Sequence, residues 1–268
     1  MQWINGQPAS QVNARDRALH YGDGCFTTAQ MCHGTILDWS SHLARLQDHC
    51  QRLWISFDEW SALESCCQRI AHERQQGVLK VLISRGSGGR GYSPQGCDAP
   101  MWLVQTSELP SHYEQWRQQG VRLGLSEVSL ARQPLLAGIK HLNRLEQVLI
   151  KQALLATDWD DALVCDTVGH IIETSMANVF WRIGNILYTP KLDQAGVAGI
   201  MRAKVLGQCA FLGVECQQVC EPISALTMAD ELMICNALLG VAPVQQFEQR
   251  MYRDFSMTRQ LQETLRSC

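Results

Sequence analysis

Four glycine-containing turns between short apolar runs constrain the fold of this 268-residue chain more than any other feature. Such turns are typical of tight β-hairpins, because glycine and asparagine readily adopt the positive φ angles that these turns need. Several hairpins with few helices do not match a doubly wound parallel sheet. The sequence therefore predicts an α+β architecture. The four turns are Asn5-Gly6, His33-Gly34, Val168-Gly169 and Gly184-Asn185.

Hydrophobic periodicity predicts helices and further strands between and beyond these turns. In the first helix, Leu43, Leu46 and Cys50 recur at helical spacing, and Ser40 or Ser41 is in position to cap the first turn. The predicted helices span residues 40–54, 58–75, 143–156, 200–212 and the segment from Ser256, and the predicted strands include 78–84, 101–106, 121–130 and 231–236.

A polar run that follows Glu108-Leu109-Pro110 separates two regions of different pattern. We expect a small α/β N-terminal domain at residues 1–110, a linker at 111–120, and a larger C-terminal domain at 121–268. The chain contains no internal repeat and no low-complexity segment, so a repeat architecture is excluded.

Composition excludes several classes of function. A net charge of −3 with 18% charged residues gives no reason to expect a nucleic-acid or membrane partner. No apolar run approaches the roughly 20 residues that span a bilayer. The twelve cysteines form no CxxC pair and no Cys/His cluster with zinc spacing, so no metal is predicted. With no signal peptide in the sequence, we expect a cytoplasmic protein whose cysteines are reduced.

Lys140 is the lysine whose surroundings suggest chemistry. It is one of five lysines, and five small or apolar residues, from Leu135 to Ile139, lead into it. Apolar surroundings lower the pKa of a lysine, and a neutral amine is what Schiff-base formation requires. The alternative is a lysine at a strand end whose ammonium group reaches water.

Three other positions are compatible with binding of an anionic, aromatic cofactor. Glu173 interrupts an apolar strand and needs a partner, either a pyridinium nitrogen or an arginine. Gly199 opens a helix, so the N–H groups of Ile200 and Met201 form a site suited to phosphate. The alternative is that Gly199 marks the start of a helix and no binding site. Arg45 is placed either to bind that phosphate or to lie in solvent on its helix.

Five motifs in a fixed order resemble the class IV pyridoxal-phosphate proteins. This family includes branched-chain aminotransferases, D-amino-acid aminotransferases and aminodeoxychorismate lyases. The resemblance covers nearly the whole chain and implies a two-domain fold, with a small α/β domain and a larger β-barrel-like domain with helices. It also implies pyridoxal 5'-phosphate as cofactor and a homodimer. The motifs are YGDGCFTT (21–28), HLARL (42–46), GIKHLNRLEQ (138–147), ETSMANVF (173–180) and GIMR (199–202).

The resemblance implies roles for individual residues of the cofactor site. Lys140 matches the lysine that binds the cofactor covalently, and Glu173 matches the carboxylate that faces the pyridine nitrogen. Arg45 matches the phosphate-binding arginine, and Ile200 and Met201 match the backbone phosphate site. Aminotransferases of this family often have threonine where Met201 stands, so one hydroxyl contact is absent here.

The substrate side is implied by the same resemblance. Arg90 and Tyr92 match residues that recognise a substrate carboxylate and are supplied by a neighbouring subunit in the D-amino-acid enzymes. Thr28 and Asn236 are candidate polar contacts to substrate. Phe26 and Thr28 alternate along a predicted strand, so both can face the site.

Within the family, the motifs most resemble those of the folate-pathway lyases. These are ISRGSGGRGY (83–92), LDQAGVAGIMR (192–202) and CNAL (235–238). The implied reaction converts 4-amino-4-deoxychorismate to 4-aminobenzoate and pyruvate. The alternatives are transamination of D-amino or branched-chain amino acids in the same fold, a non-catalytic protein that kept the fold, and a cysteine hydrolase, for which no paired histidine is evident.

Overall fold

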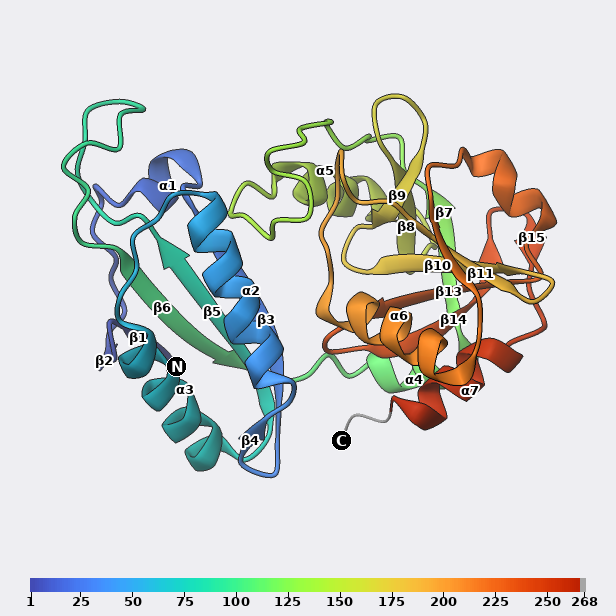
Figure 1. Cartoon of the computed structure of the whole chain (residues 1–268), viewed down its shortest axis with the longest axis horizontal. Coiled ribbons are helices and arrows are strands. Elements are labelled where there is room, and N and C mark those ends of the chain that lie inside the picture. Colours follow the sequence, from blue (N-terminus) through green and yellow to red (C-terminus); the bar gives the residue numbers. More distant parts are fainter. Residues whose placement is uncertain (266–268) are drawn as a thin grey trace. The chain divides into compact units, whose positions relative to one another are not determined.

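The computed structural model describes residues 1–265, which form two compact units (Figure 1). The first unit contains Met1–Leu109 and the short segment Ile139–Asn143. The second contains Pro110–Gly138 and the chain from Arg144 onward. Lys140 therefore belongs to the first unit, although the chain before Ile139 and after Asn143 belongs to the second.

A six-stranded antiparallel sheet forms the centre of the first unit, in the order β2-β1-β6-β5-β3-β4. The expected hairpins are confirmed, since Asn5-Gly6 connects β1 to β2 and His33-Gly34 connects β3 to β4, with positive φ at all four residues. The strands are β1 (Gln2–Ile4), β2 (Gln7–Pro8), β3 (Gly24–Cys32), β4 (Thr35–Ile36), β5 (Gly77–Ser84) and β6 (Met101–Ser107).

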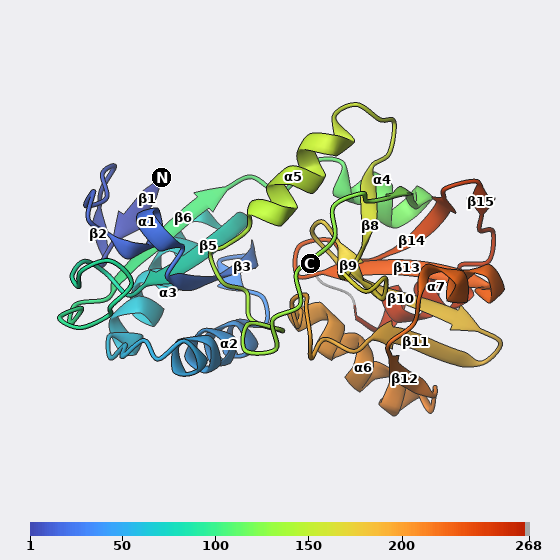
Figure 2. The ribbon, with the colours of Figure 1, turned by 90° about the horizontal axis from the view of Figure 1, so that it is seen from above.

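Two helices, α2 (Trp39–Arg52) and α3 (Trp60–Arg74), cover one face of this sheet (Figure 2). Their buried side chains, which include Leu46, Leu63 and Ile70, join strand residues in a single hydrophobic core. The expected cap at Ser40 or Ser41 is wrong. The helix starts after Asp38, whose side chain makes no capping hydrogen bond, because Asp38 has left-handed backbone angles. A one-turn helix, α1 (Arg17–Tyr21), precedes β3.

The second unit contains a nine-stranded sheet that curls on itself. Along the sheet, β10 is followed by β13, β14, β7, β8 and β9, yet only residues 175–177 connect β9 to β10 in sequence. So short a connection between strands five places apart requires a sheet whose two ends approach each other, as in a partly closed barrel. The expected β-barrel-like architecture is confirmed.

The strands of this sheet bear out the remaining hairpins, which turn at Val168-Gly169 and Gly184-Asn185. The predicted strand 121–130 is too long, because pairing with β14 and β8 ends at Leu125. The strands are β7 (Val121–Leu125), β8 (Asp161–Cys165), β9 (Ile171–Thr174), β10 (Asn178–Ile183), β11 (Ile186–Pro190), β12 (Cys216–Val219), β13 (Glu231–Asn236), β14 (Gly240–Phe247) and β15 (Arg250–Met251).

Four α-helices and one 3-10 helix complete the second unit. Helices α6 and α7 pack side by side over the sheet and share a core with it (Figure 1). Residues 111–120, expected as a linker, contain α4, because Tyr113 and Trp116 lie three residues apart and are both buried. The helices are α4 (Tyr113–Gln119), α5 (Leu145–Leu154), α6 (Ile200–Leu212), η1 (Ile223–Met228) and α7 (Ser256–Thr264).

Helix α5 presents its apolar side to the surface of this chain. Leu145 and Leu155 are 70% and 78% exposed, and Val148 and Leu149 are also exposed, whereas Ile150 on the other side is buried. Among the helices of residues 1–265, none combines the length and the apolar character needed to cross a bilayer.

Replacing the buried Glu231 by alanine should lower the free energy of unfolding by about 3–5 kcal/mol. Its carboxylate accepts hydrogen bonds from the backbone N–H groups of Met257 and Thr258, at 3.1 and 2.7 Å, in the first turn of α7, and it also pairs with Arg182 at 3.3 Å. Alanine leaves these donors without an acceptor. Urea titration measures the change.

Asp254→Ala is the matched control, because this half-exposed carboxylate pairs with the same arginine at 2.6 Å. We expect a loss of only about 1 kcal/mol there, since solvent screens the pair and only a capping contact to Ser256 is removed. Equal losses in the two variants would contradict the importance of burial.

Candidate active site

The segment that carries Lys140 lies along β3 in the first unit. The backbone N–H of Phe26 donates to the carbonyl oxygen of Lys140 at 2.9 Å, and the N–H of Leu142 donates to that of Gly24 at 3.0 Å. Residue 24 must be glycine, since a Cβ atom there would overlap the Ile83 carbonyl and Leu142. These contacts position the backbone of Lys140 against the strand.

Lys140 lies on the face of β3 that α2 and α3 leave open. Its Nζ atom is 4.5 Å from the centre of the Phe26 ring, and Thr28, two residues further on, is half-buried on the same face. A second lysine, Lys80 on β5, lies opposite Thr28 in the ladder and places its Nζ 5.0 Å from the same ring. Lys80 has no local signal in the sequence, because only the pairing of β5 with β3 brings it here.

Positive charges surround this part of the first unit. Burial lowers the pKa of His49 to about 3, and Arg45, Arg52, His141 and Lys140 lower it in the same direction. His49 is therefore neutral at physiological pH. The same positive charges that disfavour protonation of His49 would attract an anion, so the environment suits a phosphate group.

Arg45 keeps a buried donor without a partner inside the protein. One of its Nη atoms donates to the hydroxyl of Thr27, while its Nε atom is shielded from solvent and has no hydrogen-bond acceptor. Burial lowers the pKa of Arg45 to about 10, so the group remains charged at neutral pH. Because an unpartnered buried donor is costly, an anionic oxygen is the acceptor that this geometry fits.

In the second unit, Glu173 is buried near the end of β9. Its Oε2 atom accepts a hydrogen bond from the backbone N–H of Val197 at 2.9 Å. The charge of Glu173 also acts on Arg144, whose pKa is lowered by burial and raised in part by Glu173 and Glu146. The carboxylate is thus held in place by a backbone amide.

The loop before α6 is tightly held in the same unit. Gly138 pairs with it through its N–H, which donates to Gly196 at 2.9 Å, and through its carbonyl, which accepts from Ala198 at 3.1 Å. The side-chain amide of Asn178 donates to the carbonyl of Val197 at 2.8 Å. This fixes the direction in which α6 begins after Gly199, its N-cap residue.

Ile200 and Met201 are the first residues of α6 and are buried. N–H groups in the first turn of a helix have no acceptor within the helix and carry its positive dipole end. The side chain of Asn178 approaches Gly199 so closely that a Cβ atom there would overlap its oxygen. The first turn of α6 therefore offers backbone donors of the kind that bind anions, and the phosphate contact at Ile200 and Met201 stays a prediction.

The loop that carries Arg90 and Tyr92 is exposed, and a buried arginine holds the middle of its backbone. Tyr92 is 86% exposed, and Arg90 is also exposed. The buried Arg17 donates to the carbonyl oxygens of Gly91, Tyr92 and Ser93, at 3.0, 3.1 and 3.2 Å, and pairs with Asp23 at 2.7 Å. Arg17 therefore fixes the backbone, while the Tyr92 ring lies beside the ring of Tyr21, with ring centres 5.4 Å apart, and the Arg90 side chain is exposed.

Arg17→Lys should make trypsin cut after Arg90 on the order of tenfold faster in the native protein. Lysine cannot reproduce the fork that contacts three carbonyls, so the open state of the loop becomes more populated, and proteolysis follows that population. Gel or mass analysis of a digestion course measures the rate. Arg15→Lys, at an exposed position nearby, is the control, and an equal rate in both variants would count against attachment by Arg17.

Asn236 makes local contacts that occupy its side chain. Its Oδ1 atom accepts from the backbone N–H groups of Leu238 and Leu239 at 2.9 and 2.8 Å, and its Nδ2 atom lies 3.4 Å from the carbonyl of Met176. These contacts order the turn after β13. The candidate substrate contact at this residue stays a prediction.

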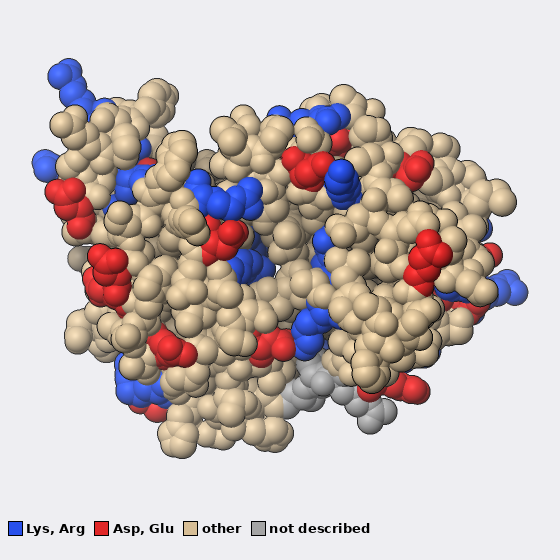
Figure 3. Space-filling view, viewed as in Figure 1, with Lys and Arg blue, Asp and Glu red and all other residues tan. Residues whose placement is uncertain are grey.

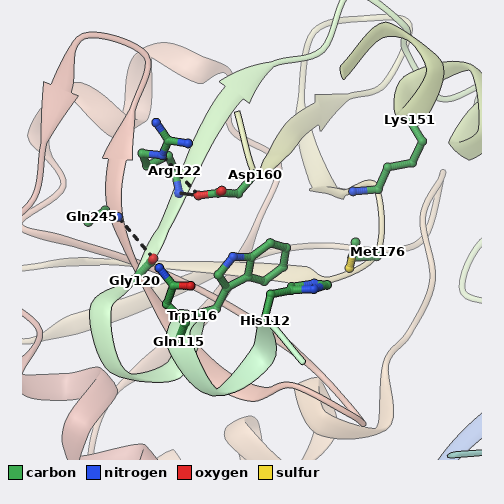
Figure 4. A pocket seen from close by; sticks show the side chains of 9 residues that line it. All are labelled: His112, Gln115, Trp116, Gly120, Arg122, Lys151, Asp160, Met176 and Gln245. Atoms are coloured by element: carbon green, nitrogen blue, oxygen red, sulfur yellow. Dashed lines mark hydrogen bonds and ion pairs between the residues drawn. The ribbon is translucent and has the colours of Figure 1, made fainter. Parts of the chain in front are cut away.

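A separate hollow of about 520 Å³ opens beside α4 in the second unit (Figure 4). Trp116 and His112 line it, and Arg122 lies 3.5 Å from Asp160 at its edge. Lys151, which also lines it, is paired with Asp161 at 3.1 Å. None of the predicted site residues lines this hollow.

Acidic and basic side chains are intermingled on the face shown in Figure 3.

Comparison with known proteins identifies the family. A model of the family described as amino-transferase class IV matches residues 24–247. The chain belongs to the class IV aminotransferase family. Aminodeoxychorismate lyase of Vibrio harveyi is 41% identical over 244 residues, which make up 91% of this chain and 90% of the relative.

Further class IV relatives extend the similarity. A crystal structure of 4-amino-4-deoxychorismate lyase from Pseudomonas aeruginosa has a TM-score of 0.95 and 37% identity, and the match covers 99% of this chain and 98% of that one. D-alanine aminotransferase of Bacillus licheniformis is 28% identical over 245 residues, covering 87% and 82% of the two chains. The predicted two-domain class IV fold is confirmed.

The predicted residues of this class IV protein fall into two groups. Thr27, His42, Lys80 and Asn178 were not among them, because their partners are distant in sequence. Of these four, only His42 lies in a position that the sequence could have indicated, within the HLARL motif. The first unit holds Lys140, Arg45, Thr28, Arg90 and Tyr92, and the second holds Glu173, Ile200, Met201 and Asn236.

Proposed function

We propose that this protein is a pyridoxal-phosphate-dependent lyase that converts 4-amino-4-deoxychorismate to 4-aminobenzoate and pyruvate in folate synthesis. The observation that carries the proposal is the 41% identity to an aminodeoxychorismate lyase over nine-tenths of both chains. The relatives named as aminotransferases are less similar, at 28% identity for the D-alanine enzyme.

The residues described above fit the cofactor. The buried Nε of Arg45 and the first N–H groups of α6 are donors suited to its phosphate. The buried carboxylate of Glu173 suits a protonated ring nitrogen, and the side-chain nitrogen of Lys140 would hold the cofactor covalently. Met201 offers a backbone donor without the hydroxyl that a threonine would add.

Lys140 is the group that moves a proton. Lys140 would hold the cofactor covalently, and its side-chain amine, when free, would remove the proton from the substrate ring carbon that bears the amino group. Pyridoxal phosphate, when bound, supplies an electron sink for the pair left on that carbon. Glu173 would keep the pyridine nitrogen of the cofactor protonated. Phe26 and Thr28 would limit how the substrate lies against Lys140.

The reaction balances without a further reactant. The bond between the ring carbon and the enolpyruvyl oxygen breaks, and the ring becomes aromatic after loss of one proton. The departing enolpyruvate takes up one proton to become pyruvate. The substrate carries two carboxylates, and Lys80 beside Thr28 and Arg90 from a neighbouring subunit are the cations that we assign to them.

We further propose a cytoplasmic homodimer. The exposed apolar side of α5 supports a second subunit, because contiguous exposed apolar residues mark interaction surfaces. Ten of the eleven cysteines in residues 1–265 are free thiols, six of them buried, and Cys32 is disulfide-bonded. The predominance of free thiols supports a reducing compartment.

The test is a direct comparison of two reactions. Purified protein with pyridoxal phosphate is given 4-amino-4-deoxychorismate, and 4-aminobenzoate is followed by fluorescence while pyruvate is measured enzymatically. The products should appear in equal amounts. Faster transamination of D-alanine with 2-oxoglutarate, or of branched-chain amino acids, would replace the lyase assignment by the aminotransferase alternative.

A further inference from the structure

A buried hydroxyl connects two conspicuous residues of α2. Thr27 on β3 is completely buried, and its Oγ1 atom lies 2.6 Å from Nδ1 of His42, which is 1% exposed. The same oxygen accepts a hydrogen bond from an Nη atom of Arg45. His42 and Arg45 are three residues apart on α2, so both reach one hydroxyl.

The hydrogen-bond inventory sets the direction of each contact. A guanidinium group only donates, so Thr27 must accept from Arg45. The hydroxyl hydrogen of Thr27 is buried and needs an acceptor of its own. His42 Nδ1 is the acceptor within reach, which means that this nitrogen carries no proton and that the imidazole proton is on Nε2.

We propose that Thr27 and His42 are positioning residues for the phosphate of the cofactor. His42 orients the Thr27 hydroxyl so that its lone pair meets Arg45, and this contact fixes the guanidinium with its Nε donor still unpartnered. The inference rests on the proposed function, because it assigns the phosphate of pyridoxal phosphate to Arg45.

The test compares two aldehydes that differ only in the phosphate. Cofactor-free protein is titrated with pyridoxal phosphate and with pyridoxal, and the dissociation constants are read from absorbance. In Thr27→Val the constant for pyridoxal phosphate should rise about tenfold, the effect of one lost charge-assisted hydrogen bond. The constant for pyridoxal should change less than about twofold, since it makes no phosphate contact.

Three further variants separate positioning from a general structural role. His42→Leu should reproduce the effect of Thr27→Val, whereas Thr27→Ser and His42→Asn, which keep the hydroxyl and an acceptor, should restore most of the affinity. The phosphorus NMR shift of the bound cofactor should move in Thr27→Val and return in Thr27→Ser. Thr35→Val, on β4 of the same sheet, is the control and should leave both constants unchanged, because the Thr35 hydroxyl only donates to the backbone carbonyl of Cys32 at 2.8 Å.

The outcomes are distinct. Equal weakening for both aldehydes, or none for either, would overturn the positioning role while leaving the lyase proposal intact. If the unaltered protein bound neither aldehyde, the proposed function would fail and this inference would fail with it. Selective weakening toward the phosphorylated aldehyde, with rescue by Thr27→Ser, supports it.

Discussion

Lys140→Ala should reduce formation of 4-aminobenzoate by at least about 100- to 10,000-fold, the contribution of a positioned acid/base group. Alanine removes both the nitrogen that we propose holds the cofactor and the amine that moves the substrate proton. The absorbance band of the covalently bound cofactor should disappear as well. Steady-state kinetics and an absorbance spectrum of the purified variant measure the two effects.

Lys80→Ala provides the matched spectroscopic control. Lys80 and Lys140 place their Nζ atoms 5.0 and 4.5 Å from the centre of the same Phe26 ring. If Lys140 forms the covalent bond, the band should persist in Lys80→Ala and vanish only in Lys140→Ala. A band that survives in Lys140→Ala would refute the assignment of this residue.

Glu173→Gln should lower kcat by roughly 10- to 100-fold, in the range of one lost hydrogen bond to a charged group. Glutamine keeps the shape and an oxygen for the Val197 N–H, which donates to Glu173 at 2.9 Å, but it cannot stabilise a protonated ring nitrogen. The cofactor would then be a weaker electron sink. Kinetics at saturating cofactor isolate this effect from binding.

Glu146→Gln is the control for Glu173→Gln. Both carboxylates raise the pKa of Arg144, so loss of either changes the charge balance around that arginine. Glu146 otherwise accepts a hydrogen bond from the backbone N–H of Ala131 at 2.7 Å, which glutamine can still accept. A similar fall in kcat in both variants would point to Arg144 rather than to the cofactor ring.

The hairpins and most helices could be predicted from sequence because their signals are local. Asn5-Gly6 and Gly184-Asn185 turn as expected, and β13 (Glu231–Asn236) and α6 (Ile200–Leu212) match the predicted ranges. The predicted cap of α2 was wrong, and α4 lies within the stretch that was predicted as a linker. Backbone angles at Asp38 and burial of Trp116 depend on neighbours that periodicity does not describe.

Lys140 and Glu173 could be selected as candidate site residues from the chain itself, because an amine or a carboxylate inside apolar sequence needs a partner. The class IV family could be identified because its motifs are short residue patterns that can be read along the chain in a fixed order. No such pattern exists for Lys80, Thr27 or Asn178, whose roles come from contacts with distant segments.

Three-dimensional packing alone decided how each of these groups is presented. Pairing of β3 with β5 brings Lys80 beside Thr28, and burial of Thr27 between β3 and α2 gives His42 and Arg45 a common partner. Curling of the larger sheet likewise depends on which strands pair, not on any one of them. Residue type and turn chemistry act over a few positions, whereas hydrogen-bond direction, burial and charge environment depend on atoms that are neighbours only after folding.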